Sequence, residues 1–218
     1  MNVSIPHRYI VIEGPIGVGK TSLARRLAGT LNAQLVLEQA EDNPFLERYY
    51  RNPGVGALPA QLYFLFQRAQ QQASLVQQDL FGSVRVADYL LAKDDLFARL
   101  TLDEEEYGLY RQVHERMAVD GPQPDLVVYL QAPVDVLLDR IARRGIAHES
   151  LIDAAYLTRL NEAYARFFHA YASSPLLIVN AASIDLVGNE ADYEELLGQI
   201  SRTVRGRLYY NPLRHKGL

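Results

Sequence analysis

The residues best able to do chemistry stand together near the start of the chain, at positions 14–21. Their spacing matches G-x-x-x-x-G-K-[ST], in which glycines let bare backbone N–H groups approach a phosphate. In this pattern Lys20 reaches the β and γ phosphates of a nucleotide, and the Thr21 hydroxyl ligates Mg²⁺. A chance glycine-rich turn is the alternative. The phosphate-binding set comprises Gly14, Pro15, Ile16, Gly17, Val18, Gly19, Lys20 and Thr21.

Two carboxylates follow short apolar runs that have the character of strands. Glu38 comes directly after residues 34–37, and Asp88 comes directly after residues 83–87. In open α/β sheets, ligands bind beyond the carboxyl ends of the strands. The sequence therefore predicts that two strands bring acids to the edge of the sheet that carries the phosphate-binding loop.

One expected helix, residues 59–79, combines polar and aromatic side chains on a single face. Gln61, Phe64, Leu65 and Arg68 fall on that face at a period of 3.6 residues. An amide, an aromatic ring and a guanidinium in one stripe are unusual for a core face. For Arg68, a solvated face rich in glutamine is the alternative.

Three arginines close another expected helix, residues 133–144. Arg140 and Arg144 lie one helical turn apart with Arg143 between them, and an irregular stretch, residues 146–150, follows Gly145. Guanidiniums clustered before such a stretch are typical of a lid that clamps phosphates. A solvated helix end that complements the helix dipole is the alternative.

Hydrophobic periodicity places these residues on strands and helices that alternate along the chain. Alternation of this kind is typical of an α/β fold with a parallel sheet. We therefore expect a five-stranded parallel sheet flanked by helices. The expected strands are residues 8–12, 34–37, 83–87, 125–131 and 175–179.

Capping and breaking residues set the expected helix ends. Asn43 and Pro44 open a short helix that Pro53 closes, and a capping box from Thr101 to Glu104 starts another. The aromatic stripe of residues 156–171 is assigned to the core, without a chemical role. The expected helices are residues 20–31, 44–52, 59–79, 89–100, 101–119, 133–144, 156–171 and 193–208.

Composition narrows the class of protein. The 218 residues are 49% hydrophobic and 22% charged, which suits one domain over residues 1–218. The net charge of −4 argues against a broad nucleic-acid or membrane surface, and zero cysteines exclude thiolate metal sites. No apolar run approaches a membrane span, and the first strand lies too near Met1 for a signal peptide. We therefore expect a soluble cytoplasmic protein without a nucleic-acid or membrane partner.

The order and spacing of these motifs resemble the deoxynucleoside kinase family over nearly the whole chain. The resemblance implies a P-loop nucleoside/nucleotide kinase fold with an arginine-containing lid. It also implies ATP and Mg²⁺ as cofactors, and a deoxynucleoside whose 5′-hydroxyl accepts the γ-phosphoryl group. The motifs are residues 13–21, Glu38, Asn43-Pro44-Phe45-Leu46 with Tyr49-Tyr50, Gln61, the Asp88 segment and residues 140–149.

The resemblance assigns a role to each matching residue around the nucleoside. Glu38 is similar to the general base that takes the 5′-hydroxyl proton. Gln61 is similar to the amide that pairs with the base edge, and Phe64 to the wall beside it. Tyr50 and Glu149 are similar to the pair that grips the 3′-hydroxyl, with Tyr50 also crowding the 2′ position.

The resemblance assigns further roles around the phosphates. Asp88 is similar to the family's acid that helps Thr21 to hold Mg²⁺, and Arg140 and Arg144 are similar to its lid arginines. We also assign Arg143 to the ATP site because it stands between those two arginines.

Two positions depart from the family pattern. The arginine expected after Asp88 is Tyr89, and we expect Lys93, one helical turn on, to substitute in catalysis. A further lid arginine is replaced by Ile146, which leaves phosphate clamping to fewer side chains.

The pocket for the base is expected to depend on Arg68 and Asp94. Their positions resemble those of an arginine and an aspartate in the deoxycytidine and purine branch of the family. Because a buried guanidinium without its carboxylate is costly, we expect the two to be coupled. The resemblance thus implies a purine deoxynucleoside as substrate, and a homodimer formed through the helices of residues 59–79 and 103–119.

Two alternatives remain at the level of sequence. A thymidylate-type nucleotide kinase would need extra cations for the substrate phosphate, and Arg48 and Arg51 are candidates, although an acid at Glu38 favours a hydroxyl acceptor. A P-loop switch module would recruit partners according to its nucleotide state and would have no use for Gln61, Tyr50 and Glu149.

Overall fold

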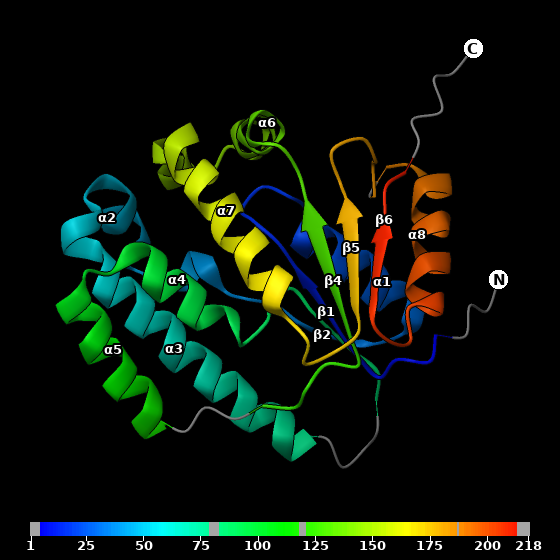
Figure 1. The fold of residues 1–218 in the computed structure, drawn as a ribbon, viewed down its shortest axis with the longest axis horizontal. Coiled ribbons are helices and arrows are strands. Elements are labelled where there is room, and N and C mark those ends of the chain that lie inside the picture. Colours follow the sequence, from blue (N-terminus) through cyan, green and yellow to red (C-terminus); the bar gives the residue numbers. More distant parts are fainter. Residues whose placement is uncertain (1–4, 79–82, 118–120, 187, 213–218) are drawn as a thin grey trace.

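A computed structural model describes residues 5–78, 83–117, 121–186 and 188–212. Its centre is a parallel sheet in the order β2-β3-β1-β4-β5-β6 (Figure 1). The prediction of a parallel α/β sheet flanked by helices is confirmed, but the sheet has six strands instead of five. The strands are β1 (Tyr9–Glu13), β2 (Gln34–Val36), β3 (Arg85–Ala87), β4 (Leu126–Gln131), β5 (Leu176–Asn180) and β6 (Arg207–Tyr210).

The sixth strand lies at the end of the segment predicted as the last helix, residues 193–208. Helix α8 (Glu190–Arg202) ends at Thr203, and Gly206, with φ at 67°, turns the chain back toward the sheet. β6 then pairs with β5 in parallel, with Leu177 opposite Leu208. A strand of only four residues is too short to show a period of two, so the prediction of helix for residues 207 and 208 is wrong.

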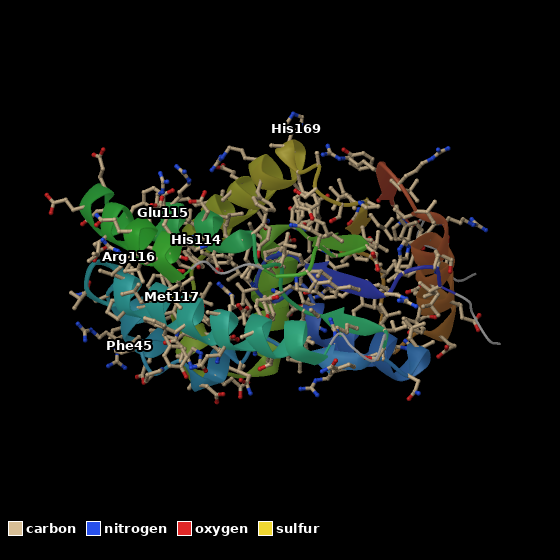
Figure 2. All side chains as sticks on the ribbon, turned by 90° about the horizontal axis from the view of Figure 1, so that it is seen from below. Phe45, His114, Glu115, Arg116, Met117 and His169 are labelled. Carbon is tan, nitrogen blue, oxygen red and sulfur yellow. The ribbon has the colours of Figure 1, made fainter. Side chains whose placement is uncertain are left out.

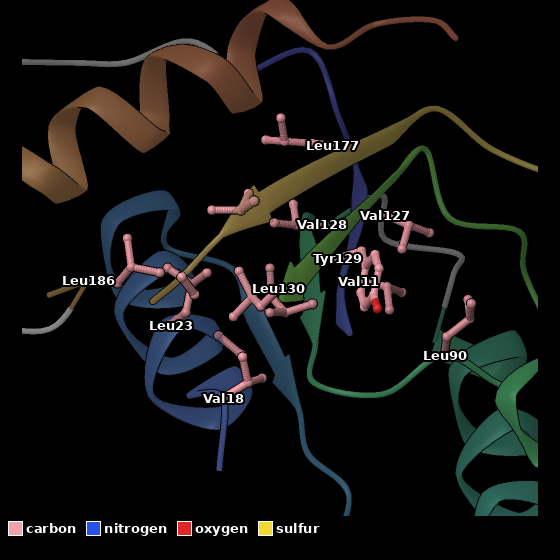
Figure 3. Packing of buried hydrophobic residues seen from close by; sticks show 14 of the residues in the cluster. Val11, Val18, Leu23, Leu90, Val127, Val128, Tyr129, Leu130, Leu177 and Leu186 are labelled. Carbon is pink, nitrogen blue, oxygen red and sulfur yellow. The ribbon is translucent and has the colours of Figure 1, made fainter. Parts of the chain in front are cut away.

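β1 lies at the centre of the sheet, between β3 and β4. Val11 is paired with Ala87 on one side and with Val127 on the other. Every residue of β1 is buried, as expected for a strand covered on both faces. Along β4, Val127 and Tyr129 point to one face and Val128 and Leu130 to the other (Figure 3).

Helices cover both faces of the sheet. On one side, α1 (Lys20–Leu31) and α8 lie next to each other, with the Arg26 guanidinium 3.8 Å from the centre of the Tyr193 ring. On the other side lie α3 (Pro53–Gln78), α4 (Lys93–Thr101) and α7 (Ala154–Ala170) (Figure 1). Tyr164 and Phe168 of α7 stack on the Tyr129 ring. The assignment of this aromatic stripe to the core holds for these residues.

The remaining helices lie around the edge of the site. They are α2 (Leu46–Arg51), α5 (Glu104–Met117), α6 (Val134–Arg144) and the short 3₁₀ helices Ala40–Asp42 and Ala147–Leu151. Helix α5 packs along α3, and Figure 2 shows Met117, at its end, beside α3. Within the described residues, no helix has the length and apolar character needed to cross a bilayer.

Three expected helix boundaries are wrong. Pro53 opens α3 instead of closing the preceding helix, because proline suits the first turn, where its missing N–H has no partner to lose. Thr101 ends α4, and Asp103 caps α5 by accepting from the Glu106 N–H at 2.8 Å. Tyr89 is not helical, since α4 begins at Lys93. The helical-face argument that linked Tyr89 to Lys93 is therefore wrong.

Candidate active site

The phosphate-binding loop joins β1 to α1, as its pattern predicts. Gly17 and Gly19 have φ angles of 81° and 104°, which favour glycine. A Cβ added to Gly14 would lie 2.4 Å from the Leu130 carbonyl oxygen, so the loop also needs glycine for close packing. The Lys20 ammonium donates to the Gly14 carbonyl at 2.8 Å, and burial and the nearby Lys93 lower its pKa. The loop is shaped to receive an anion beside a partly buried cation.

Asp88 joins the loop to the end of β2. Its Oδ2 accepts from the Thr21 hydroxyl at 2.5 Å, and its Oδ1 accepts from the Glu38 N–H at 2.7 Å. Burial raises the pKa of Asp88 against these two hydrogen bonds. The predicted meeting of two strand-end acids at the loop edge is therefore observed. The Thr21 and Asp88 oxygens are a donor set suited to Mg²⁺, which takes few protein ligands and completes its shell with phosphate and water.

Glu38 lies between two cations. Its Oε2 accepts from the Lys93 ammonium at 3.0 Å, and its Oε1 is hydrogen-bonded to the Arg68 guanidinium. Burial alone would raise the pKa of this carboxyl, but the charges of Lys93 and Arg68 hold it well below its usual range. Glu38 is thus an ionised carboxylate, able to accept a proton or a hydrogen bond from a substrate hydroxyl.

Arg68 links Glu38 to Asp94. The Arg68 Nη1 forms an ion pair with Asp94, whose side chain is 1% exposed. The predicted coupling of this buried guanidinium to a carboxylate is therefore observed, and the solvated alternative for Arg68 is wrong. The Arg68 guanidinium also lies 5.1 Å from the centre of the Phe64 ring. α3 and α4 thus share one buried charge cluster.

The side chains expected to contact the nucleoside lie around one cleft at the carboxyl ends of the strands. Gln61 is buried, and its amide donates to the Thr101 hydroxyl at 3.2 Å. Tyr50 stacks on His148 with ring centres 6.0 Å apart. Glu149 accepts from the Arg144 guanidinium at 2.5 and 2.9 Å, so it already has a cationic partner. The 3₁₀ turn that holds His148 and Glu149 packs against α2 at the edge of the cleft.

The lid arginines separate into three environments. Arg140 donates to the Val18 carbonyl at 3.2 Å and to the Ala181 carbonyl at 2.7 Å, which ties α6 to the phosphate-binding loop. Burial lowers the pKa of Arg140. Arg144 faces the cleft, but Arg143 is exposed and pairs with Asp139 on its own helix. Arg143 is therefore not brought together with the other predicted site residues.

A cleft of about 850 Å³ collects most of the predicted residues at the carboxyl ends of the strands. Ile146, at the position of the missing lid arginine, also lines it. The predicted residues on its wall are Ile16, Lys20, Thr21, Glu38, Tyr50, Gln61, Phe64, Arg68, Asp88, Lys93, Arg144 and Glu149.

Two residues at this cleft had no role assigned from the sequence: Glu13, which stood only at the start of the motif of residues 13–21, and Tyr164, which lines the cleft. Glu13 is fully buried and accepts from the Gly14 N–H at 2.8 Å, the Leu90 N–H at 2.7 Å and the Tyr164 hydroxyl at 2.9 Å. The Lys93 ammonium lies 3.7 Å from the same carboxylate. The available signal was a charged residue at the end of the otherwise apolar β1. No comparable signal marked Tyr164, whose spacing is that of an ordinary core residue.

Three comparisons place the chain among known proteins. The family model for deoxynucleoside kinase matches residues 10–205. A deoxyguanosine kinase of Bacillus subtilis is 31% identical over 201 residues, covering 90% of this chain and 97% of the relative. A deoxyadenosine kinase of Lactobacillus acidophilus is 31% identical over 214 residues, covering 91% and 97%. The solved deoxyadenosine kinase of M. mycoides with bound dCTP has a TM-score of 0.74 at 25% identity, covering 88% and 98%.

Proposed function

Since the chain belongs to the deoxynucleoside kinase family, we propose that it transfers the γ-phosphoryl group of ATP to the 5′-hydroxyl of a purine deoxynucleoside. The observation that carries this proposal is Glu38, an ionised carboxylate whose backbone N–H is 2.7 Å from Asp88 at the phosphate-binding loop. A carboxylate at this place suits an acceptor that must lose a proton. A phosphorylated acceptor has no such need, which argues against the nucleotide kinase alternative.

In the proposed reaction, the 5′-oxygen attacks the γ-phosphorus, and the bond to the β–γ bridging oxygen breaks to release ADP. The 5′-hydroxyl proton passes to Glu38. The Lys93 ammonium, 3.0 Å from the Glu38 Oε2, balances the charge of that carboxylate. It takes over the role of the family's arginine, whose position holds Tyr89 in this chain. Little covalent chemistry falls to the protein, so its contribution is mainly positioning and charge neutralisation.

The residues present fit a bound nucleotide and metal. Lys20 and the glycines of residues 14–19 would hold the phosphates, and Thr21 and Asp88 would hold Mg²⁺. Bound Mg²⁺ would supply neutralisation of the charge on the transferred group. Arg140 and Arg144 would add positive charge at the lid. We assign Arg143 no contact, because it lies on the outer side of α6.

The proposed preference for a purine comes from the α3 wall of the cleft. Gln61 can donate and accept along a base edge, and the Arg68–Asp94 pair supplies fixed polar groups behind it. A site built to hydrogen-bond one edge rejects bases that leave its polar groups unpaired. The names of the relatives, deoxyguanosine and deoxyadenosine kinases, support the same choice. Tyr50 and Glu149 would hold the 3′-hydroxyl.

A panel of substrates tests this proposal. The four deoxynucleosides and their ribonucleosides are each incubated with the protein, ATP and Mg²⁺, and ADP release is measured. We expect deoxyadenosine or deoxyguanosine to have the highest kcat/KM, deoxycytidine to follow, and thymidine and the ribonucleosides to be poor. A protein that phosphorylates thymidine best would contradict the proposed pocket. ADP release that does not depend on nucleoside would contradict the kinase itself.

We also propose that two copies associate through α3 and α5. Phe66 on α3 and Leu109 on α5 are about half exposed, so each of these helices offers an apolar side chain to a second copy. Size-exclusion chromatography with light scattering should give about twice the chain mass of 24.6 kDa. A 24.6 kDa species would exclude the homodimer. We place the protein in the cytoplasm, where its proposed donor ATP is available.

A further inference from the structure

Glu38 and the residues on either side of it, 37–39, follow the end of β2 and have no strand pairing. The last hydrogen bond between β2 and the β3 end runs from the Asp88 N–H to the Val36 carbonyl at 3.2 Å. Past it, the Glu38 N–H is held by the Asp88 carboxylate, but the carbonyls on either side need other donors. The position of a catalytic carboxylate there must be set by something other than strand pairing.

Two glutamine amides of α3 supply those donors. The Gln71 Nε2 donates to the Leu37 carbonyl at 3.0 Å, and the Gln67 Nε2 donates to the Gln39 carbonyl at 3.2 Å. The Gln39 carbonyl also accepts from the Asp42 N–H at 3.2 Å. Among the described residues, the Leu37 carbonyl has Gln71 as its hydrogen-bond donor and no other. Gln71 is therefore the less replaceable of the two amides.

The same face of α3 carries the proposed base-binding side chains. Gln61, Phe64, Arg68 and Gln71 recur at intervals of three or four residues and Gln67 stands next to Arg68, which puts all five on one side of the helix. A single helix thus carries the side chains proposed to bind the base and also contacts the Glu38 carboxylate and the backbone on both sides of Glu38. A displacement of α3 would move all of these together.

We propose that Gln71, and to a lesser degree Gln67, are positioning residues that hold the Glu38 carboxylate at the reacting 5′-hydroxyl and couple it to the helix that reads the base. This inference depends on the proposed function, because it assumes that Glu38 is the general base. Arg68 and Lys93 set the charge around the carboxylate, but two ion pairs to a side chain do not fix its backbone, and Asp88 holds that backbone only at the Glu38 N–H. The amides hold the carbonyls on either side of Glu38, and a displacement of about 1 Å at a reacting group can cost roughly 100-fold in rate.

The first test replaces each amide by a side chain of similar length that cannot donate. Gln71→Met should lower kcat about tenfold and Gln67→Met about threefold, with KM for deoxynucleoside and ATP within twofold. Gln70→Met, an exposed position on the same helix, is the matched control and should keep kcat. An unchanged kcat in Gln71→Met, or a loss of thermal stability and a rise in KM without a loss of kcat, would overturn the proposal.

The second test separates positioning from a general structural role. Gln71→Met is made in the Glu38→Gln background, and kcat is compared around the double-mutant cycle. If Gln71 acts through Glu38, its substitution should cost less than twofold once Glu38 can no longer accept a proton. An equal tenfold cost in both backgrounds would overturn the inference and leave the proposed function standing. A Glu38→Gln variant of normal kcat would instead overturn the role of Glu38 itself.

Discussion

The buried charges of α3 and α4 and the arginines at the end of α6 are held in opposite ways. Arg68 is 4% exposed and pairs with two carboxylates from other elements, Asp94 and Glu38. Arg143 is 73% exposed and pairs with Asp139 one turn away on its own helix. Buried ions need fixed partners, whereas exposed pairs contribute little and exchange easily with water.

The difference separates a pre-arranged half of the site from an adaptable half. On the proposed nucleoside side, the charges of Arg68, Asp94 and Glu38 are fixed by one another within the protein. On the lid side, Arg144 is 43% exposed and holds Glu149, so its guanidinium has room to turn toward phosphates. Rigid placement of the acceptor hydroxyl and a movable phosphate clamp together suit a phosphoryl transfer. The following predictions test that division, in order of decreasing effect.

Removal of Asp94 should have the largest effect. Asp94→Ala leaves the Arg68 guanidinium buried with Glu38 as its remaining partner, and we expect a loss of roughly 3 kcal/mol in the free energy of unfolding. Urea unfolding measures it. The exposed neighbour gives the control, since Asp95→Ala should cost much less. Equal losses in the two variants would mean that Asp94 is not part of a fixed buried cluster.

Removal of both partners should be milder than removal of one. Arg68→Met with Asp94→Ala deletes the buried charge together with its partner, so stability should partly return. The same double change should move base preference toward thymidine, measured as the ratio of kcat/KM values. A double variant that keeps the purine preference would show that this pair does not select the base.

The next largest effect is expected at Glu38. Glu38→Gln keeps the shape of the side chain but removes its basicity, so kcat should fall roughly 100-fold or more while deoxynucleoside binding persists. Single-turnover kinetics measures the loss in the chemical step, and equilibrium binding of the nucleoside shows whether affinity persists. Near-normal kcat would refute the role of this residue as general base.

Lys93 should have a smaller effect with a defined dependence on pH. Lys93→Met should lower kcat about tenfold with little change in KM for nucleoside. Because Lys93 and Arg68 hold the pKa of Glu38 below its usual range, loss of Lys93 raises that pKa. The acid limb of the pH profile of kcat/KM should therefore shift to higher pH. Lys93→Arg should largely restore kcat and the position of the acid limb. An acid limb that does not move in Lys93→Met would contradict the role of Lys93 in balancing the charge of Glu38.

The smallest effects are expected at the lid. Arg144→Ala should raise KM for ATP several-fold, because this guanidinium faces the cleft. Arg143→Ala should leave KM for ATP and kcat within twofold, since the side chain lies outside the cleft. Steady-state kinetics with varied ATP compares the pair. A larger effect at Arg143 than at Arg144 would mean that α6 changes its orientation during turnover and turns Arg143 toward the phosphates.

Much of the fold and of the phosphate side of the site could be predicted from the sequence. The loop of residues 14–21, the strand-end positions of Glu38 and Asp88 and the stripe with Gln61 and Arg68 depend on spacing within one segment. Helix ends were less predictable, because proline fits the first turn of a helix as well as the residue after one. Pro53 shows this ambiguity.

The sequence by itself determined which side chains stand at the end of which strand or on which face of a helix, because these depend on local periodicity. Only the tertiary structure decided which of them meet. Lys93 reaches Glu38 across 55 residues of chain and Gln71 reaches the Leu37 carbonyl across 34, while Arg143 turns away beside an inward-facing Arg144. Such contacts depend on how α3, α4 and α6 pack against the sheet and are not encoded in the spacing of any one segment.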